Sequence, residues 1–403
     1  MIENILQLLV SFILALGISL YAVPIVIRVV RKLRLFDNPN ERSAAERPIP
    51  TLGGIAIFVS FIFASTIGLR GYEFPEMIYI VTAILLMFFV GLKDDIVTLS
   101  AGKKLMAQIL TAGIIIFFAK VRFTNLHGFL GIGEIGMIFS VILTGFVIIV
   151  LINSFNLMDG IDGLAGGLTM LAALVFGTWF FISGHFEYAI LSVSLIGAIG
   201  GFFYFNVYGD KNRIFMGDTG SLVLGTIMSI IVIRFNEFNI DQTQAYAIAS
   251  TPAVSFGILL YPLADTVRVM IIRILHRKSP FTADKNHLHH RLLALGFSHK
   301  RATYTIVFTN LIFMLSIIAM QHFGILELMF FILGVGSILF MIPAYMLQRK
   351  NLIQKDDPHQ QLLIPGQAYE ILKAKRYSLK VAQRSTPLRL TTLQEFFQKL
   401  NLW

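Results

Sequence analysis

The sequence contains no cysteine and few charged residues. Without cysteine the chain can form no disulfide, bind no metal through thiolates and use no cysteine nucleophile. Only 14% of its 403 residues are charged, whereas 56% are hydrophobic, and the mean hydropathy is +0.75. Because ordinary soluble domains have a much smaller apolar share, this composition excludes them and indicates a membrane protein.

Long apolar segments recur along the whole chain. Since a bilayer core requires about 20 apolar residues per helix, the sequence predicts an all-α polytopic membrane protein with about eleven transmembrane helices. The first apolar run, Ile5 to Ile27, is too long for the core of a signal peptide and has no basic segment before it, so we expect it to be retained. The predicted spans cover residues 4–27, 51–69, 77–92, 105–119, 136–153, 163–182, 188–207, 220–234, 245–272, 303–321 and 325–347.

Lys and Arg are distributed unevenly between the predicted loops. The loop after the first span contains six of them and the loop after the ninth contains seven, whereas the loops on the opposite side contain only Arg70, Lys120, Arg122 and Arg234. Cytoplasmic loops carry an excess of these residues, so the N-terminus is expected outside and the C-terminus inside. The net charge of +10 then reflects topology and anionic lipid headgroups, and no nucleic-acid partner is expected.

The first polar motif is GLKDDIVTLSAGKK, residues 91–104, at the end of the third predicted span. It places Asp94 and Asp95 at the C-terminal end of a helix, which carries partial negative charge, so a cation is needed beside them. Lys103, Lys104 or a divalent metal with oxygen ligands would provide it. Alternatively, the two acids only end one helix and cap the next.

The second motif is NSFNLMDGIDGLAGG, residues 153–167. Asn153, Asn156, Asp159 and Asp162 recur at intervals of three, so a helical or turn-like backbone directs them to one side. The glycines between them let the backbone approach a ligand closely. Because the motif is rich in both side-chain oxygen atoms and glycine, it favours a nucleotide or metal-phosphate site. The alternative is a polar loop without function.

The third motif is NRIFMGDTGS, residues 212–221, before the eighth predicted span. Asp218 has the position of an ordinary helix N-cap, which is the simplest interpretation of it. The motif nevertheless repeats the combination of an acid and glycines in another loop on the same side of the membrane. Phe215 adds a ring against which a base can stack.

The fourth motif is ADKNHLHHRLLALGFSHK, residues 283–300. Its three histidines do not complete a zinc site by their spacing, because only His287 and His290 would share a helical face. Beside Arg291 and other basic residues, His287, His289 and His290 are better suited to binding phosphate oxygens. A basic loop at the membrane surface and adventitious metal binding remain the alternatives.

These motifs, in this order and in successive cytoplasmic loops, resemble those of the polyprenyl-phosphate N-acetylhexosamine-1-phosphate transferases of glycosyl transferase family 4. The resemblance covers about residues 1–347 and includes the turn RPIPTLGG at 47–54. It implies transfer of a sugar 1-phosphate from a UDP-sugar to undecaprenyl phosphate with release of UMP, an initiating step of cell-envelope polysaccharide synthesis.

The resemblance also implies a donor, a location and an assembly. HLHHRL is closer to the HIHH-type sequence of the GlcNAc-1-phosphate transferases than to the HHHFE-type sequence of the MurNAc-pentapeptide enzyme, which favours UDP-GlcNAc. Another UDP-N-acetylhexosamine or UDP-MurNAc-pentapeptide is the alternative donor. The expected location is the bacterial inner membrane, and related enzymes suggest a homodimer.

Residue roles follow from the resemblance by motif position. Mg²⁺, or alternatively Mn²⁺, is expected on Asn156 and Asp218, while Asp162 hydrogen-bonds uracil and Phe215 stacks on it. The expected catalytic residues are Asp94, Asp95, Lys104 and His287, and the expected substrate-binding residues are Asn153, Asp159, Asp162, Phe215, His289, His290 and Arg291.

One of Asp94 and Asp95 would act either as a base for the lipid phosphate or as a nucleophile. We favour direct attack by the lipid, because its phosphate is already largely ionised at neutral pH.

A membrane carrier is the rival interpretation, because acids in membrane segments are also typical of carriers. Carriers, however, place such acids near the midplane and often show inverted repeats. Here only Asp265 and Arg268 resemble an intramembrane pair, either as site residues or as a structural salt bridge.

Two domains are expected from the distribution of apolar residues. Residues 1–347 form the transmembrane transferase domain, and residues 348–403 form a polar cytoplasmic tail. Within the tail, LTTLQEFFQKL at 390–400 has the pattern of a short amphipathic helix, although a weakly structured tail is favoured.

Overall fold

The computed structural model describes residues 2–33, 36–37, 49–210, 212–275, 277 and 287–355. Its contacts divide the chain into two units, Met1–Ala344 and Tyr345–Trp403. The predicted helix at 390–400 lies outside the described residues, and the domain boundary expected at residue 347 stays a prediction. The architecture below is that of the first unit.

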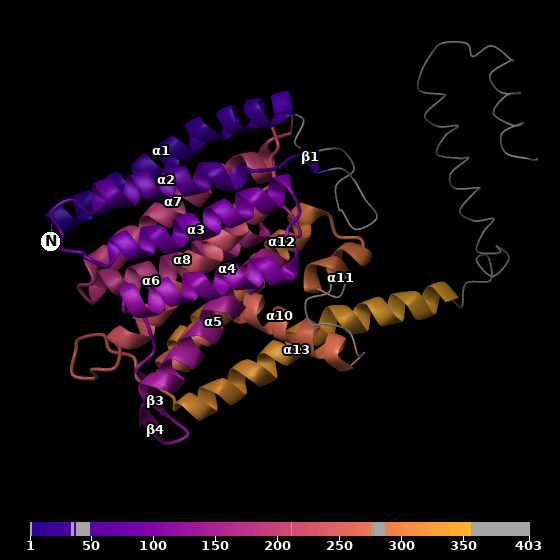
Figure 1. Cartoon of the computed structure of the whole chain (residues 1–403). Helices are drawn as coiled ribbons and strands as arrows, with labels where there is room; N and C mark the ends of the chain where they lie inside the picture. The colour runs from indigo at the N-terminus through magenta and orange to yellow at the C-terminus, as the bar shows by residue number, and fades with distance from the viewer. Residues whose placement is uncertain are drawn as a thin grey trace, which may run out of the picture. The chain divides into compact units, whose positions relative to one another are not determined.

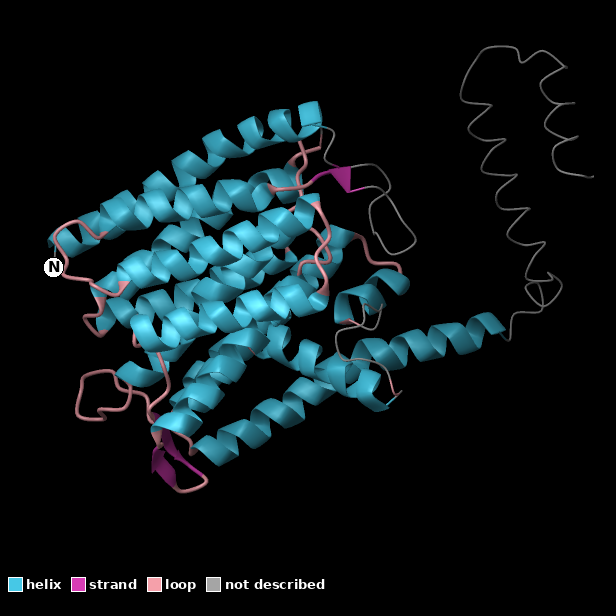
Figure 2. Cartoon of the chain, viewed as in Figure 1, coloured by secondary structure: helices cyan, strands magenta, loops and turns pink. Residues whose placement is uncertain are grey.

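The described chain is almost entirely helical (Figure 2). Its strands form two short antiparallel pairs, β1 (Phe36–Asp37) with β2 (Ile49–Pro50) and β3 (Asn125–Phe129) with β4 (Ile132–Glu134). The helices are α1 (Ile2–Leu33), α2 (Gly53–Gly68), α3 (Met77–Ile96), α4 (Ala101–Gly113), the π-helical η1 (Ile114–Phe118), α5 (Met137–Met158), α6 (Leu164–Ile182), α7 (Phe186–Tyr208), α8 (Gly217–Phe238), α9 (Thr251–Ile258), α10 (Leu260–Leu275), α11 (Leu288–Ala294), α12 (His299–Ala319) and α13 (Ile325–Lys355).

Helix α8 is the centre of the bundle. It packs against α2, α3, α5 and α6, and nearly all of its side chains are buried. Around α8, helix α1 packs on α2 and α7, and α3 packs on α4 (Figure 1). A helix that is apolar on all sides belongs in the interior, whereas the outer helices leave large apolar side chains exposed, as expected where lipid surrounds them.

The multi-pass character predicted from the sequence is confirmed. Among the described residues, nine helices are long and apolar enough to cross a membrane, one of them formed by α4 and η1 together. The second predicted span is a shorter apolar helix, α2. The exact number of spans and the orientation stay predictions.

The predicted ninth span, residues 245–272, is wrong as a single helix. Within this apolar run the structure contains two helices, α9 and α10, which are separated at Leu259. Pro252 lies in the first turn of α9, where a missing N–H is tolerated. Pro262 lies in the first turn of α10 and cannot donate a hydrogen bond to the carbonyl of Ile258, so one of the bonds that would join the two helices is missing. Hydropathy alone does not detect this break.

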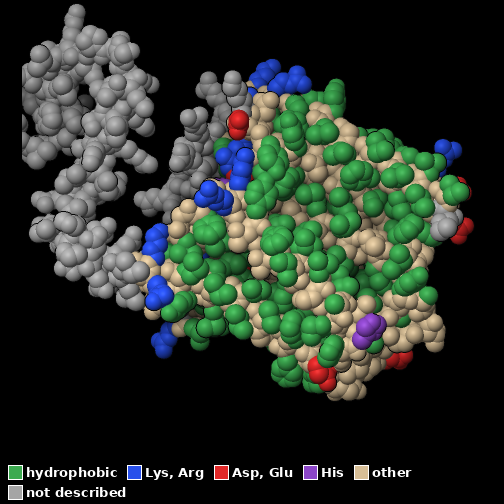
Figure 3. All heavy atoms as spheres, turned by 180° about the vertical axis from the view of Figure 1, so that it is seen from behind, with side chains coloured by type: hydrophobic (Ala, Val, Ile, Leu, Met, Phe, Trp, Pro, Cys, Tyr) green, Lys and Arg blue, Asp and Glu red, His purple; other side chains and the backbone are tan. Residues whose placement is uncertain are grey.

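Basic side chains gather at one end of the bundle. Figure 3 shows Lys and Arg along one edge of the molecule and few at the opposite edge. The C-terminal turns of α1 contribute Arg28, Arg31 and Lys32 to the basic end. This distribution supports the expectation that this end faces the cytoplasm.

The packing of α8 gives a testable prediction at Gly225. A Cβ atom at this position would lie 2.5 Å from the Cα atom of Ile152 in α5, so the two helix backbones would have to separate. We expect Gly225→Ala to lower the free energy of unfolding by about 1–3 kcal/mol. The matched control is Gly334→Ala, because a Cβ there has nothing within 4 Å and alanine is the better helix former. Thermal unfolding in detergent measures both, and equal melting temperatures would contradict the prediction.

Candidate active site

Segments far apart in the sequence meet at the basic end of the bundle. Asp94 and Asp95 lie in the last turn of α3, and Lys104 lies in the first turn of α4. Asn156 lies near the end of α5, and Asp218 is in the first turn of α8. The structure therefore brings together residues from the first three sequence motifs.

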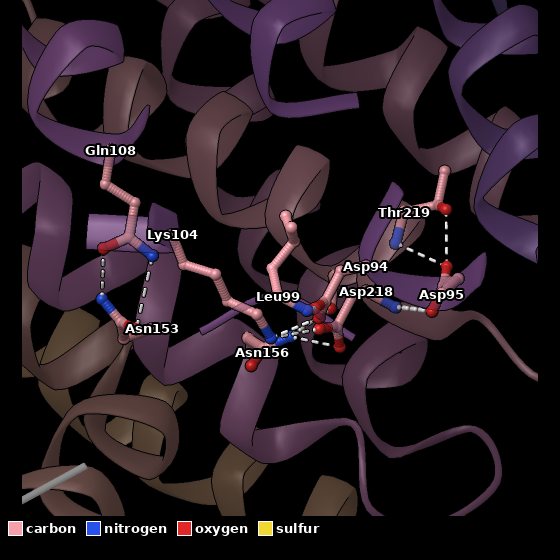
Figure 4. Close-up of polar contacts among 10 residues, drawn as sticks. Asp94, Asp95, Leu99, Lys104, Gln108, Asn153, Asn156, Asp218 and Thr219 are labelled. Atoms are coloured by element: carbon pink, nitrogen blue, oxygen red, sulfur yellow. Dashed lines mark hydrogen bonds and ion pairs between the residues drawn. The ribbon is translucent and has the colours of Figure 1, made fainter. Parts of the chain in front are cut away.

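Lys104 connects two of the acids (Figure 4). Its Nζ atom donates to Asp218 Oδ2 at 2.7 Å and forms an ion pair with Asp94. Asn156 Nδ2 donates to Asp218 Oδ1 at 2.8 Å. Of the two lysines expected beside the acids, Lys104 lies there, whereas Lys103 is exposed. These four polar side chains, Asp94, Lys104, Asn156 and Asp218, are called the acidic cluster below.

Asp95 has a different position from its neighbour. Its Oδ1 accepts the amide of Asp218 at 2.8 Å, and its Oδ2 accepts the amide of Thr219 at 2.9 Å and the hydroxyl of Thr219 at 2.5 Å. A carboxylate at a helix N-terminus is favoured by the partial positive charge of the helix. Asp95 therefore caps α8 from another helix, while Asp94 faces Lys104.

Two glycines allow the backbones around Asp218 to approach closely. A Cβ atom on Gly91 of α3 would lie 2.5 Å from the carbonyl oxygen of Asp218. A Cβ atom on Gly54 of α2 would lie 2.1 Å from the amide nitrogen of Gly220, and the Gly54 amide donates to the carbonyl of Met216 at 2.9 Å. The glycines of the TLGG turn are thus explained by contact with the start of α8.

Asn153 pairs with a residue that the sequence motifs did not include. Its Nδ2 donates to Gln108 Oε1 at 2.8 Å, and Gln108 Nε2 donates back at 3.3 Å. Gln108 lies one helical turn after Lys104, on the same face of α4. The pair joins α4 to α5 beside the acidic cluster (Figure 4).

Asp159 follows the end of α5. Burial, together with the negative charges of Asp218 and Asp95, raises the pKa of Asp159 to about 8. Its carboxyl group is therefore mostly protonated at neutral pH. A bound cation would favour loss of this proton.

Asp162 is buried and already paired. Its carboxylate forms an ion pair with Arg213 and lies 3.2 Å from His299 Nδ1. The Arg213 guanidinium carbon lies 5.9 Å from the centroid of the Phe215 ring, which is half-buried. The predicted uracil contact of Asp162 stays a prediction.

The described part of the fourth motif begins with a histidine that contacts a buried acid. His287 precedes α11, and its Nδ1 atom lies 2.8 Å from Oδ2 of Asp265 in α10. Asp265 also pairs with Arg268 at 2.6 Å. Of the two roles left open for Asp265 and Arg268, the structure thus shows the salt bridge and, in addition, a contact with a predicted site residue.

His289 connects the fourth motif to the second. Its ring packs against the backbone at Gly160, where a Cβ atom would lie 2.3 Å from Nε2. Burial, with the neighbouring His290 adding to the effect, lowers the pKa of His289 to about 3. His289 is therefore neutral at physiological pH and would contact phosphate as a hydrogen-bond donor, not as a cation. The His290 ring lies 4.3 Å from that of His289, and Arg291 is half-buried.

Several residues of the site were not predicted from the sequence. Thr219, Gln108, Arg213 and His299 each complete a pair with a predicted residue more than 40 positions away. No local pattern reveals such a pair. The exception is Gln108, whose helical spacing from Lys104 could have identified it.

The acidic cluster fits a magnesium ion that is shared with a substrate. Among the described residues, no three His, Cys, Asp or Glu side chains form a group that would hold a metal alone. Mg²⁺ usually takes only one or two carboxylates from a protein and its other ligands from phosphates and water. Asp94, Asp218 and the amide oxygen of Asn156 provide such a partial set.

The cap of α8 gives a second prediction. Asp95→Ala would leave two amides and one hydroxyl without their acceptor, so we expect the free energy of unfolding to fall by about 2–3 kcal/mol. Asp210→Ala, at an exposed position before α8, should change it by less than about 0.5 kcal/mol. Thermal unfolding compares the two variants. Equal melting temperatures would show that the cap does not stabilise α8.

Comparison with known proteins identifies the family. A model of glycosyl transferase family 4 matches residues 77–236, from α3 to α8. A probable undecaprenyl-phosphate N-acetylglucosaminyl 1-phosphate transferase of Bacillus subtilis is 31% identical over 79% of this chain and 86% of its own. The undecaprenyl-phosphate alpha-N-acetylglucosaminyl 1-phosphate transferase of Escherichia coli K12 is 30% identical over 68% of this chain and 73% of its own.

The matched region contains the acidic cluster, and the longer alignments cover most of the helical bundle. The expected family is thereby confirmed: the chain belongs to glycosyl transferase family 4, among the polyprenyl-phosphate N-acetylhexosamine-1-phosphate transferases.

Proposed function

We propose that the protein transfers GlcNAc 1-phosphate from UDP-GlcNAc to undecaprenyl phosphate, giving undecaprenyl-diphosphate-GlcNAc and UMP. The observation that carries this proposal is the acidic cluster, which joins Asp94, Lys104, Asn156 and Asp218 at one end of a membrane bundle. Relatives named for this reaction support the choice of GlcNAc.

The reaction requires little covalent chemistry from the protein. An oxygen of the lipid phosphate attacks the phosphorus attached to GlcNAc, a new P–O bond forms, and the bond to the bridging oxygen breaks as UMP leaves with that oxygen. Phosphoryl transfer of this kind depends mainly on positioning and on neutralising charge. An ammonium group beside two carboxylates is suited to both tasks.

A divalent cation would complete the charge balance. Asp218 and Asn156 would hold Mg²⁺, or alternatively Mn²⁺, with Asp94 close by. When bound, the ion would withdraw charge from the diphosphate of the donor. Lys104, which pairs with both acids in the structure, would then be available to a phosphate oxygen.

The two neighbouring acids receive different roles in this proposal. Because both oxygens of Asp95 are engaged by the start of α8, we assign it to holding Asp218 in place. Asp94 is the acid that lies beside Lys104 and Asp218, so any direct part of a carboxylate in the transfer falls to Asp94. Direct attack by the ionised lipid phosphate remains the favoured pathway.

The position of the site agrees with a lipid acceptor and a soluble donor. The acidic cluster lies at helix ends, whereas a carrier places such acids near the midplane of the membrane. With the expected orientation, these helix ends would lie where the lipid headgroups and the cytoplasm meet. Val267, Ile271 and Ile274 of α10 are exposed and offer an apolar surface for the lipid chain. We therefore assign the protein to the bacterial inner membrane; a homodimer stays a prediction from related enzymes.

The experiment that tests the function is release of UMP by the purified protein. We expect release with undecaprenyl phosphate, Mg²⁺ and UDP-GlcNAc, because the acceptor, the metal ion and the donor are then all present. Omission of the lipid should abolish it. UDP-MurNAc-pentapeptide in place of UDP-GlcNAc tests the alternative donor.

Two variants accompany this experiment. Asp218→Ala should reduce the rate by at least about 100-fold, since it removes a proposed ligand of the metal. Asp210→Ala, an exposed aspartate before α8, should retain the rate. Release from UDP-MurNAc-pentapeptide alone would overturn the choice of donor, and lipid-independent release would overturn the transfer.

A further inference from the structure

We propose that Asp265 is a positioning residue for the transfer, which acts by fixing the ring of His287. This inference rests on the proposed function. Asp265 lies in α10, outside the four sequence motifs, whereas His287 is the first histidine of HLHH. Both residues are buried, with 4% and 5% of their surface exposed.

The contact determines which ring nitrogen carries hydrogen. Oδ2 of Asp265 lies 2.8 Å from His287 Nδ1. A carboxylate can only accept a hydrogen bond, so Nδ1 must be the donor. Nε2 is then the nitrogen that remains for a substrate. It donates a hydrogen bond to a phosphate oxygen when it carries a proton and accepts one when it does not.

Asp265 is itself held rigidly. Arg268 donates to Oδ1 at 2.6 Å, and the amide of Leu288 donates to the same oxygen at 3.2 Å. The carboxylate therefore fixes both the side chain of His287 and the backbone that follows it. A buried carboxylate with this set of partners costs less to desolvate than an unpaired one.

The histidine that Asp265 fixes lies beside the site. The rings of His287 and His289 are nearly parallel, with 10° between their planes and 5.7 Å between their centroids. His289 in turn packs on Gly160, next to Asp159. The HLHH segment thus connects the buried contact between Asp265 and His287 with the loop after α5. We assign Nε2 of His287 to a phosphate oxygen of the departing UMP.

A double-mutant cycle tests this role. Asp265→Asn retains the shape of the side chain, but its amide can also donate, so the ring of His287 is no longer fixed in one tautomer. We expect kcat for UMP release to fall at least about tenfold, with the KM for UDP-GlcNAc changing less than about threefold. In a protein that already carries His287→Gln, the same substitution should have no further effect on kcat.

The control is a matched acid at the opposite end of the bundle. Glu76 pairs with Arg234 at 3.2 Å, so Glu76→Gln also breaks one pair between an acid and an arginine. It should leave kcat unchanged. If Asp265→Asn lowers kcat by the same factor with and without His287, the residue acts through stability alone and the proposal is overturned.

A measurement without turnover separates this inference from the function. The chain has nine histidines, and the ¹⁵N resonances of His287 can be assigned by their loss in His287→Gln. We expect Nδ1 to be protonated in the full-length wild-type protein and the tautomers to mix in Asp265→Asn. Unchanged resonances in Asp265→Asn would overturn the proposal, whether or not UMP is released. Absence of UMP release together with the expected resonances would instead contradict only the proposed transfer, and the effect of Asp265 on the ring of His287 would stand.

Discussion

The hydrogen bonds from the first amides of α8 to Asp95 are the constraint on which the rest of the site depends. They attach the end of α3 to the start of the central helix and thereby set the position of Asp218. Glycines at positions 54 and 91 allow the neighbouring backbones to come close enough for this arrangement. Once α8 is fixed, Lys104 and Asn156 reach Asp218 from two further helices.

The same end of the bundle concentrates negative charge that requires compensation. Lys104 provides part of it, and burial beside Asp218 and Asp95 raises the pKa of Asp159, which reduces the negative charge there. In the proposed reaction, a divalent cation that arrives with the diphosphate of the donor would provide the rest. Two further pairs connect separate segments: Asp162 with Arg213 joins the second motif to the third, and Asp265 with His287 joins α10 to the fourth motif.

Much of this arrangement could be predicted from the sequence, because apolar length predicts helices and the polar motifs all fall at helix ends on one side. The break within residues 245–272 could not be predicted, because hydropathy does not detect it and a proline alone does not decide it: Pro24 and Pro343 lie inside continuous helices. The different roles of Asp94 and Asp95 could not be predicted either. Adjacent residues at the end of a helix point in different directions, and only the tertiary structure decides which neighbours they meet. The contact of Asp265 with His287 shows the same limit, because the two residues lie 22 positions apart.

The central claim is that Asp218 holds a divalent cation together with the donor, and Mn²⁺ binding followed by electron paramagnetic resonance tests it most directly. We expect the purified protein to bind Mn²⁺ tightly only when UDP-GlcNAc is present, because in the part of the chain that the structure describes no three His, Cys, Asp or Glu side chains form a group that would hold a metal alone. Asp218→Asn should weaken this binding at least about tenfold, while Asp210→Asn should not. Equal binding by Asp218→Asn and the wild-type protein, or tight binding without the donor, would contradict the claim.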